Sequence, residues 1–223
     1  MPWQSRLLAA VPHLLLFFLT LTMTTTVPAT NALGFFRTVG KLKTLKRTGW
    51  VNNDVFEPES VADHMYRMAM LGFLISDTAV DKDRLIKVCL VHDLAEAVVG
   101  DITPLDGVSK EEKRRLEETA MKQILGDIGN DTVAAELMAL WLDYEEGTGP
   151  EAAVARQLDK YEMIVQADEY ERAQGKTLDS FFKSTEGFFT HYEVAAWAKE
   201  LLDSRALRLA ACAEPELKKP KTG

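Results

Sequence analysis

Residues 85–101 read LIKVCLVHDLAEAVVGD. The first seven are apolar except for Lys87, and so dense an apolar run indicates a helix in the centre of the fold. His92 and Asp93 follow this run directly, at a position where an unpaired buried ion costs several kcal/mol. Because a divalent metal ion would compensate both side chains, we predict a metal site here. The helix itself is predicted from Asp83 to Val99, with the glycine that follows as its end.

The other ligands of such an ion must come from elsewhere in the chain. Adjacent helical positions diverge by about 100°, so His92 and Asp93 can share one ion only if it lies over the edge between them. His64 is the first candidate, because it lies beside an apolar helix stripe, three residues after Val61 and four before Met68. The alternative for a lone histidine on such a face is a hydrogen-bonded core residue.

Further carboxylates have suitable spacing. Glu96 lies four residues after His92 and three after Asp93, so the three side chains approach one helix face. A glutamate in this place can hold and deprotonate a water molecule on the ion. Asp101 follows at the helix end. Asp159 lies in a charge-rich helical segment, where spacing alone favours a solvated surface residue over a ligand.

The apolar periodicity is helical almost throughout. Ser60 and Asp63 have the spacing of a capping box that opens a helix after Pro58. An earlier amphipathic segment from Leu33 to Leu42 is expected to end at the Thr48-Gly49 pair. Four more helices are predicted, at residues 109–125, 131–146, 151–174 and 191–209. No alternating, strand-like run is present, so the sequence predicts an all-α bundle of six or seven helices.

Composition restricts the class of protein. The 223 residues include 26 Lys and Arg against 34 Asp and Glu, a net charge of −8. This length, with 47% hydrophobic and 27% charged residues, fits one globular domain. An acidic chain repels phosphate backbones, so we expect no nucleic-acid polymer as a partner, although a small anion can bind at a local cation. The only two cysteines, Cys89 in the apolar run and Cys212 near the C-terminus, favour a reducing compartment over a disulfide framework.

The two ends differ from the middle of the chain. Residues 1–31 form an N-terminal extension with Arg6 as its only charge, an apolar run at 7–19 and a Thr-rich stretch. This pattern fits a targeting segment or an extension without function. The run is too short, and too broken by Pro12, for stable membrane insertion. Residues 206–223 are predicted to be a flexible tail, which leaves residues 32–205 as the domain.

Four stretches together resemble a known family: LKRTGW (45–50), PESVADHMYRMAM (58–70), VHDLAEAVVGDITP (91–104) and QLDKYEMIVQADEYE (157–171). A histidine, an adjacent His-Asp pair and a distant aspartate, in this order on helices, resemble the HD-domain superfamily of metal-dependent phosphohydrolases. The sequences of these four stretches are similar to those of the HD domain-containing protein 2 family, eukaryotic relatives of the bacterial 5′-deoxynucleotidases. The resemblance implies an HD-domain helical bundle and the hydrolysis of deoxyribonucleoside 5′-monophosphates to deoxynucleoside and phosphate.

The resemblance also implies a role for each matching residue. The metal ligands correspond to His64, His92, Asp93 and Asp159. Glu96 corresponds to the catalytic acid or base, and Arg47 to the arginine that orients the substrate phosphate. The nucleotide pocket corresponds to Asp101, Ile102, Thr103 and Pro104, and some relatives hold further ions at Glu96, Asp101 and the carbonyl of Ile102. Trp50 corresponds to a tryptophan near the deoxyribose, which follows the arginine directly in the bacterial enzymes, whereas Thr48 and Gly49 intervene here.

The ligand types narrow the choice of metal and leave two other functions open. Two imidazoles and two carboxylates form a mixed nitrogen and oxygen site that favours Mn²⁺ or Co²⁺, with Fe²⁺, Zn²⁺ and Mg²⁺ as alternatives. The alternative functions are another HD phosphohydrolase, acting on cyclic nucleotides or triphosphates, and a non-catalytic nucleotide-binding module. The presence of Glu96, Asp101 and Arg47 together speaks against the binding module.

The resemblance implies a homodimer as well. Aromatic residues of the C-terminal part could form the dimer face or simply close the bundle: Phe181, Phe182, Phe188, Phe189 and Trp197. We expect the protein in the cytoplasm or the interior of an organelle, where an enzyme of this family would meet its substrate.

Overall fold

The computed structural model describes residues 26–147 and 149–213. Within these ranges the only strand-like contact is one antiparallel bridge between Lys46 and Ser60. Seven helices of the described part of the chain have ten residues or more: α1 (Ala29–Gly40), α3 (Val61–Gly72), α4 (Lys82–Val91), α6 (Lys110–Gly126), α7 (Asp131–Glu146), α8 (Pro150–Gln174) and α10 (Tyr192–Ala213). The shorter elements are α2 (Thr48–Val51), α5 (Glu96–Val99), α9 (Asp179–Lys183), and the 3-10 turns η1 (Lys41–Lys43) and η2 (Pro104–Asp106). The predicted all-α bundle is confirmed.

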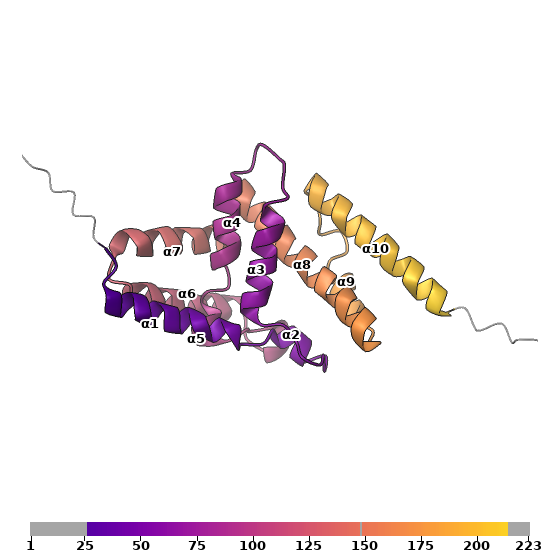
Figure 1. Ribbon diagram of the computed structural model, residues 1–223, viewed down its shortest axis with the longest axis horizontal. Helices are drawn as coiled ribbons and strands as arrows, with labels where there is room; N and C mark the ends of the chain where they lie inside the picture. The colour runs from indigo at the N-terminus through magenta and orange to yellow at the C-terminus, as the bar shows by residue number, and fades with distance from the viewer. Residues whose placement is uncertain (1–25, 148, 214–223) are drawn as a thin grey trace, which may run out of the picture.

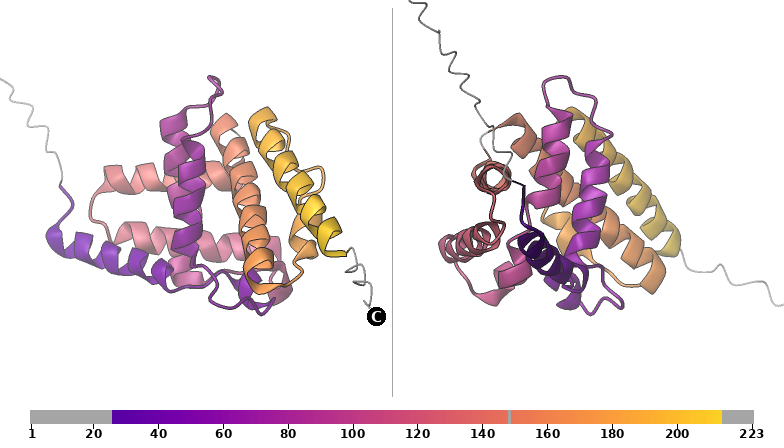
Figure 2. Two further views of the ribbon diagram at one scale, coloured as in Figure 1. Left: turned by 45° about the vertical axis from the view of Figure 1, so that its right-hand side comes forward. Right: turned by 60° about the vertical axis from the view of Figure 1, so that its left-hand side comes forward.

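Three helices form the centre of the molecule. Helices α3, α4 and α8 pack against one another, and α7 adds to the contacts of α4 and α8 on one side. Helix α10 lies along the outer side of α8, and α6 lies between α5 and α7 (Figures 1 and 2). Side chains that point inward from α3, α4 and α8 can therefore meet although they lie far apart in the sequence.

The predicted apolar stripe of α3 is buried. Val61 and Met68 have no exposed surface, Met65 is 5% exposed, and Ile75, just beyond the helix, is fully buried. On α4 the partners of this stripe include Leu85, Val88 and Cys89, which are also fully buried. Because burying an aliphatic side chain of this size contributes about 1.5–3 kcal/mol, this contact contributes strongly to the stability of the bundle.

Capping residues place the start of α3 where the sequence predicts it. The Ser60 hydroxyl accepts a hydrogen bond from the Asp63 backbone N–H at 3.1 Å, and the Asp63 carboxylate accepts one from the Ser60 N–H at 2.8 Å. This is the predicted capping box, which satisfies two amide donors at the helix N-terminus. It also sets the position of His64 one turn into the helix.

The continuous helix predicted from Asp83 to Val99 is wrong. Helix α4 ends at Val91, and α5 begins only at Glu96. In between, the Leu94, Glu96 and Ala97 amides donate to the carbonyl oxygens three residues back, at 3.0–3.2 Å, instead of four residues back. This tighter winding breaks the α-helix at the His-Asp pair itself. The predicted end at Gly100 is correct, because that glycine has a left-handed φ of 80°.

The predicted break at Thr48-Gly49 is also wrong. Helix α1 already ends at Gly40, and Thr48 and Gly49 instead open the short helix α2. Helix α1 begins at Ala29 and α10 continues to Ala213, whereas residues 1–25 and 214–223 lie outside the described residues, including the apolar run at 7–19. Where the structure describes the chain, no helix has both the length and the apolar character needed to cross a membrane.

Most of the C-terminal aromatic residues close the bundle. Phe182 is 5% exposed, and Phe181, Phe189 and Trp197 are partly buried against the core. Only Phe188, of the five, is exposed. Both cysteines are free, with Cys89 buried and Cys212 exposed, as a protein without a disulfide framework requires.

Candidate metal centre and substrate cavity

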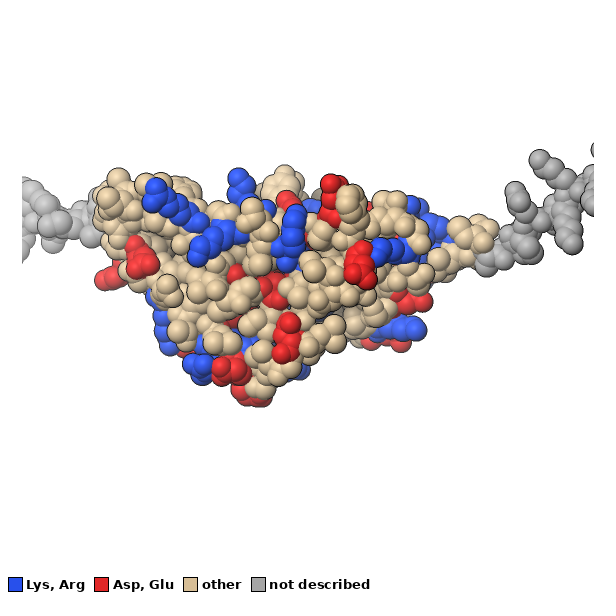
Figure 3. All heavy atoms as spheres, turned by 90° about the horizontal axis from the view of Figure 1, so that it is seen from below, with Lys and Arg blue, Asp and Glu red and all other residues tan. Residues whose placement is uncertain are grey.

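A cavity of about 570 Å³ lies where α2, the segment after α5, α8 and α9 meet. The structure brings every predicted site residue except His64 to its wall: Arg47, Trp50, His92, Asp93, Glu96, Asp101, Ile102, Thr103, Pro104 and Asp159. His64 is fully buried behind the wall. Figure 3 shows the molecule from the side where α1, α2 and α5 lie, with acidic atoms recessed near the middle of this face.

Three of the predicted ligands form one cluster. Nitrogen or oxygen atoms of His64 on α3, His92 after α4 and Asp159 on α8 all lie within 4.8 Å of one another. The His64 Nε2 atom is 3.3 Å from Asp159 Oδ1. Neither His64 Nε2 nor His92 Nε2 has a hydrogen-bond partner among the described residues, although both atoms are buried. Buried polar atoms normally have partners, so these two nitrogens fit a metal ion between them.

Asp93 joins the cluster from its open side. Its Oδ2 atom lies 3.1 Å from His92 Nε2 and 3.9 Å from His64 Nε2. The guanidinium of Arg47 faces the same point, with Nη1 3.2 Å from Asp93 Oδ2 and Nη2 3.8 Å from Asp159 Oδ1. The turn between α4 and α5 therefore allows His92 and Asp93, adjacent in the sequence, to face one point together.

The electrostatic environment of the cluster favours a cation. Burial and the charge of Arg47 lower the pKa of His64, but the carboxylates of Asp159 and Glu162 outweigh them and raise it to about 9. Burial raises the pKa of Asp93, but His92, Arg47 and His64 together bring it well below its usual range. Surroundings that stabilise positive charge on a buried imidazole also stabilise a divalent cation.

Each histidine is oriented by a contact of its other ring nitrogen. His64 Nδ1 lies 2.6 Å from Oε2 of Glu162, a fully buried residue one turn after Asp159 on α8. His92 Nδ1 lies 2.9 Å from the backbone carbonyl oxygen of Cys89. Both oxygens accept hydrogen bonds, so Nδ1 keeps its proton in each ring, and Nε2 is the nitrogen whose lone pair would bind a cation.

Glu96 and Asp101 lie beside the cluster. Glu96 is 3% exposed and its Oε2 atom has no hydrogen-bond partner in the described part of the chain. Burial, and then the charges of Asp93 and Asp101, raise its pKa well above the usual range. Asp101 accepts a hydrogen bond from the Thr48 N–H at 2.7 Å, which ties the loop after α5 to the start of α2. A buried glutamate with a raised pKa can carry a proton near neutral pH, as a general acid requires.

Trp50 is part of the cavity wall, although its side chain is almost completely buried. Its indole is 1% exposed, and its N–H donates to Oε1 of Glu59 at 2.8 Å. The ring of Phe181 on α9 lies against it, with centroids 4.3 Å apart and planes inclined by 32°. Phe181, which lines the cavity and is only partly buried, therefore covers the tryptophan from the cavity side.

Several wall residues were absent from the sequence-based prediction. The Tyr144 hydroxyl donates to Asp159 Oδ2 at 3.1 Å, and its ring centroid lies 4.7 Å from that of His92. Lys160 Nζ lies 3.1 Å from Asp159 Oδ2, and Lys113 and Phe181 also line the cavity. Lys160 follows the predicted ligand Asp159 directly in the sequence, and this position could have indicated that it lies near the site. Nothing local in the sequence distinguishes Tyr144, because its direction depends on how α7 packs.

The family model of the HD domain matches residues 39–197. The chain belongs to the HD domain family. This HD domain is 50% identical to the 5′-deoxynucleotidase HDDC2 of Danio rerio over 186 residues, which cover 82% of this chain and 92% of that protein. It is 48% identical to the 5′-deoxynucleotidase HDDC2 of Homo sapiens over 187 residues, 83% of this chain and 91% of that protein.

A solved structure is similar to the same HD domain. It is that of a predicted metal-dependent phosphohydrolase from Magnetospirillum magnetotacticum MS-1, with a TM-score of 0.63 and 27% sequence identity. The match covers 80% of this chain and 95% of that protein. Residues 39–197, which match the HD domain, include α3, α4 and α8, so the family assignment and the residue cluster concern the same helices.

Proposed function

We propose that this HD domain is a metal-dependent 5′-deoxynucleotidase, which hydrolyses deoxyribonucleoside 5′-monophosphates to deoxynucleoside and phosphate. The observation that carries the proposal is the convergence of Glu96, Asp101 and Arg47 on the histidine and aspartate cluster within one cavity. A module that only binds nucleotides can use an arginine to hold the phosphate, but it does not need a buried glutamate with a raised pKa beside the metal cluster. Relatives that are about half identical over most of the chain have the name of this activity.

The donor set supports four ligands for the metal: His64, His92, Asp93 and Asp159. The mixture of imidazole and carboxylate suits Mn²⁺ or Co²⁺, with Fe²⁺, Zn²⁺ and Mg²⁺ as alternatives. Glu96, Asp101 and the Ile102 carbonyl provide oxygen donors for a second ion. When bound, such a cation supplies a Lewis acid that makes water nucleophilic near neutral pH.

Side chains of the protein would bind the substrate and transfer the protons. Arg47 offers a planar, charged donor pair to the phosphate oxygens, held in place by Asp93 and Asp159. Glu96, at the cavity wall, would take a proton from the attacking water or return one to the leaving 5′ oxygen. Asp101, with Ile102, Thr103 and Pro104, would form the nucleotide wall, joined to α2 through the Thr48 amide. Trp50 would act there mainly by supporting Phe181.

Phosphate release from a nucleotide panel tests this proposal. We expect the purified protein with added Mn²⁺ or Co²⁺ to release inorganic phosphate from dAMP and the other deoxynucleoside monophosphates. Cyclic AMP and dATP should not be turned over. Chromatography of the nucleotide products checks this, because conversion of cyclic AMP to AMP, or of dATP to deoxyadenosine and triphosphate, frees no inorganic phosphate. Turnover of either in place of dAMP would assign the chain to another HD phosphohydrolase activity, and no release from any deoxynucleotide would reject the enzyme.

Two variants test the assignment of roles. Asp93→Ala should lose both bound metal and activity, because it removes a ligand from the cluster. Glu96→Gln should keep its metal content and lose about 10²–10⁴-fold in kcat, the usual contribution of a positioned acid or base. Metal analysis by mass spectrometry separates the two effects. Full turnover with stoichiometric metal in Asp93→Ala would show that the metal lies elsewhere.

We also propose that the protein is a homodimer and that it works in the cytoplasm or an organelle interior, where deoxynucleotides are found. The resemblance to dimeric relatives supports the dimer. Four of the five aromatic residues considered for its face are buried or partly buried in the monomer, which leaves Phe188 as the exposed member of this group.

A further inference from the structure

The cavity has two chemically different sides beyond the metal cluster. On one side α6 and α7 contribute charged residues, namely Lys113, Glu117 and Glu145. On the other side α8, α9 and the turn after α2 contribute uncharged residues, among them Asn53, Met163, Ser180 and Phe181. The base of a nucleoside monophosphate is a neutral aromatic ring, so with the phosphate at Arg47 and the metal cluster the uncharged side is the one that suits the base.

Phe181 is the aromatic surface on the uncharged side. One face of its ring lies on Trp50, at a centroid distance of 4.3 Å. Its edge lies so close to α2 that a Cβ atom at Gly49 would come within 3.4 Å of the ring. The ring is nevertheless only partly buried, and it lines the cavity. An aromatic face that is supported from behind and open in front suits a planar ligand.

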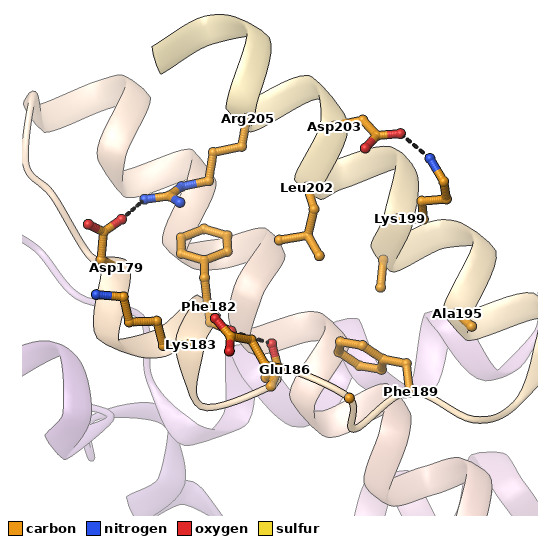
Figure 4. A pocket seen from close by; sticks show the side chains of 13 residues that line it. Asp179, Phe182, Lys183, Glu186, Phe189, Ala195, Lys199, Leu202, Asp203 and Arg205 are labelled. Carbon is orange, nitrogen blue, oxygen red and sulfur yellow. Dashed lines mark hydrogen bonds and ion pairs between the residues drawn. The ribbon is translucent and has the colours of Figure 1, made fainter. Parts of the chain in front are cut away.

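Contacts on the far side of α9 hold this surface in place. Figure 4 shows that side, where Arg205 of α10 pairs with Asp179 and lies over Phe182. The Arg205 guanidinium carbon is 3.9 Å from the centroid of the Phe182 ring, which is 5% exposed. Glu171 of α8 accepts a hydrogen bond from the Leu178 N–H at 2.8 Å, just before α9 begins. Phe181 is therefore presented by a short helix that is anchored through its neighbours.

We propose that Phe181 stacks against the base of the substrate and so determines that the enzyme acts on nucleotides. This inference rests on the proposed 5′-deoxynucleotidase function and adds the residue that recognises the nucleoside part. Stacking on an aromatic side chain is tolerant of sequence, because every base has a π-face. The same contact is accordingly expected for all four deoxynucleotides.

A matched pair of substrates tests the proposal. The pair is dAMP and 2-deoxyribose 5-phosphate, which has the same phosphate ester and sugar but no base. Phe181→Ala should raise the KM for dAMP about 5- to 150-fold, the range found when a base-stacking aromatic residue is removed. The kcat for dAMP and the kcat/KM for deoxyribose 5-phosphate should stay within a factor of two of the wild type. Phe181→Leu, which keeps apolar volume over Trp50, should show the same selective rise.

Phe188→Ala provides the matched control, because Phe188 is an exposed phenylalanine of the same region that lines neither the cavity nor the groove in Figure 4. Phe188→Ala should leave kcat and KM for both substrates unchanged. Equal losses of kcat/KM for dAMP and deoxyribose 5-phosphate in Phe181→Ala and Phe181→Leu would indicate a structural role and overturn the proposal. Unchanged kinetics of both variants with dAMP would also overturn it.

Calorimetric binding separates this inference from the proposed function. Wild-type protein should bind dAMP more tightly than deoxyribose 5-phosphate, and Phe181→Ala should remove the difference. If that pattern holds while no deoxynucleotide is hydrolysed, the proposed function fails and the role of Phe181 stands. Equal affinity of the wild type for both compounds would overturn the role of Phe181.

Discussion

Glu162 shows how a single buried carboxylate prepares the candidate metal centre. Its Oε2 atom lies 2.6 Å from His64 Nδ1, and its Oε1 atom lies 3.4 Å from Arg67 Nε. The carboxylate holds the proton of His64 on Nδ1, away from the cluster, and increases the basicity of the ring. Arg67 in turn compensates the negative charge from the protein surface, where its side chain is one-third exposed.

Removal of this carboxylate should weaken metal binding without removing a ligand. We expect Glu162→Ala to lower the affinity for Mn²⁺ about 10- to 100-fold, as other losses of such supporting contacts do. Glu162→Gln should retain most of the affinity, because its amide oxygen can still accept the Nδ1–H. Calorimetric titration of the metal-free protein measures both.

Glu169→Gln is the control for this experiment. Glu169 is exposed and contacts the outer nitrogens of Arg67, at 2.9 and 3.1 Å, without reaching His64. It should bind Mn²⁺ like the wild type. An equal loss of affinity in Glu169→Gln and Glu162→Ala would mean that Arg67, not the contact with His64, is responsible.

Helix α8 carries both the site and the anchor of α10. Near its middle it presents Asp159 and Glu162 to the cluster, and three turns later it presents Glu171, which is 3% exposed. Both carboxylate oxygens of Glu171 accept hydrogen bonds from Arg205 of α10, at 2.7 and 2.8 Å, and Arg208 adds a third at 2.8 Å. This contact joins α8 to α10 and, through Leu178, to α9.

The stability of this junction should depend on acid. Burial raises the pKa of Glu171, but the hydrogen bonds from Arg205, the Leu178 amide and Arg208 lower it to about 2, from the usual value of 4.5. A carboxylate whose pKa is lower in the folded state stabilises the fold above pH 4.5, and this stabilisation is lost as the pH falls toward 2.

Glu171→Gln should therefore lower the free energy of unfolding at pH 7 by about 1.5–3 kcal/mol, the range for hydrogen bonds to charged groups. It should also flatten the loss of stability between pH 5 and pH 3. Urea unfolding followed by circular dichroism at these pH values measures both effects. Asp203→Asn, which breaks an exposed pair with Lys199 on α10, should change neither. If Glu171→Gln lost stability between pH 5 and pH 3 as steeply as the wild type, Glu171 would not be the source of the acid sensitivity.

The molecule as a whole is acidic, with 34 Asp and Glu against 26 Lys and Arg, yet its candidate site is arranged for an anionic substrate. Several of the acidic residues face the metal cluster, where a bound cation would offset them. Arg47 adds a positive charge at the same cavity. The surface charge thus disfavours long nucleic acids, while the cavity offers one phosphate a place to bind.

The proposed homodimer is a property of the molecule as a whole and can be tested by its mass in solution. Light scattering during gel filtration should give about twice the monomer mass of 24.9 kDa. A mass of one chain at every concentration would exclude the dimer.

Near neighbours in the chain were enough to predict the all-α fold, the capping box of α3, its buried stripe and the position of His92 and Asp93 after an apolar run. Each depends on periodicity or on contacts across one helical turn. The break between α4 and α5 was missed because Leu, Ala and Glu at 94–96 are good helix formers, and their local preference is overridden by packing.

Other features depend on residues that meet only after folding. Glu162 contacts His64 across 98 positions of the sequence, and Asp159 becomes buried only because α8 packs against α3 and α4. Trp50 is covered by Phe181, which lies on a helix more than a hundred residues away. In each case helix packing decides which way the side chain points, and the spacing of residues within one helix does not contain that information.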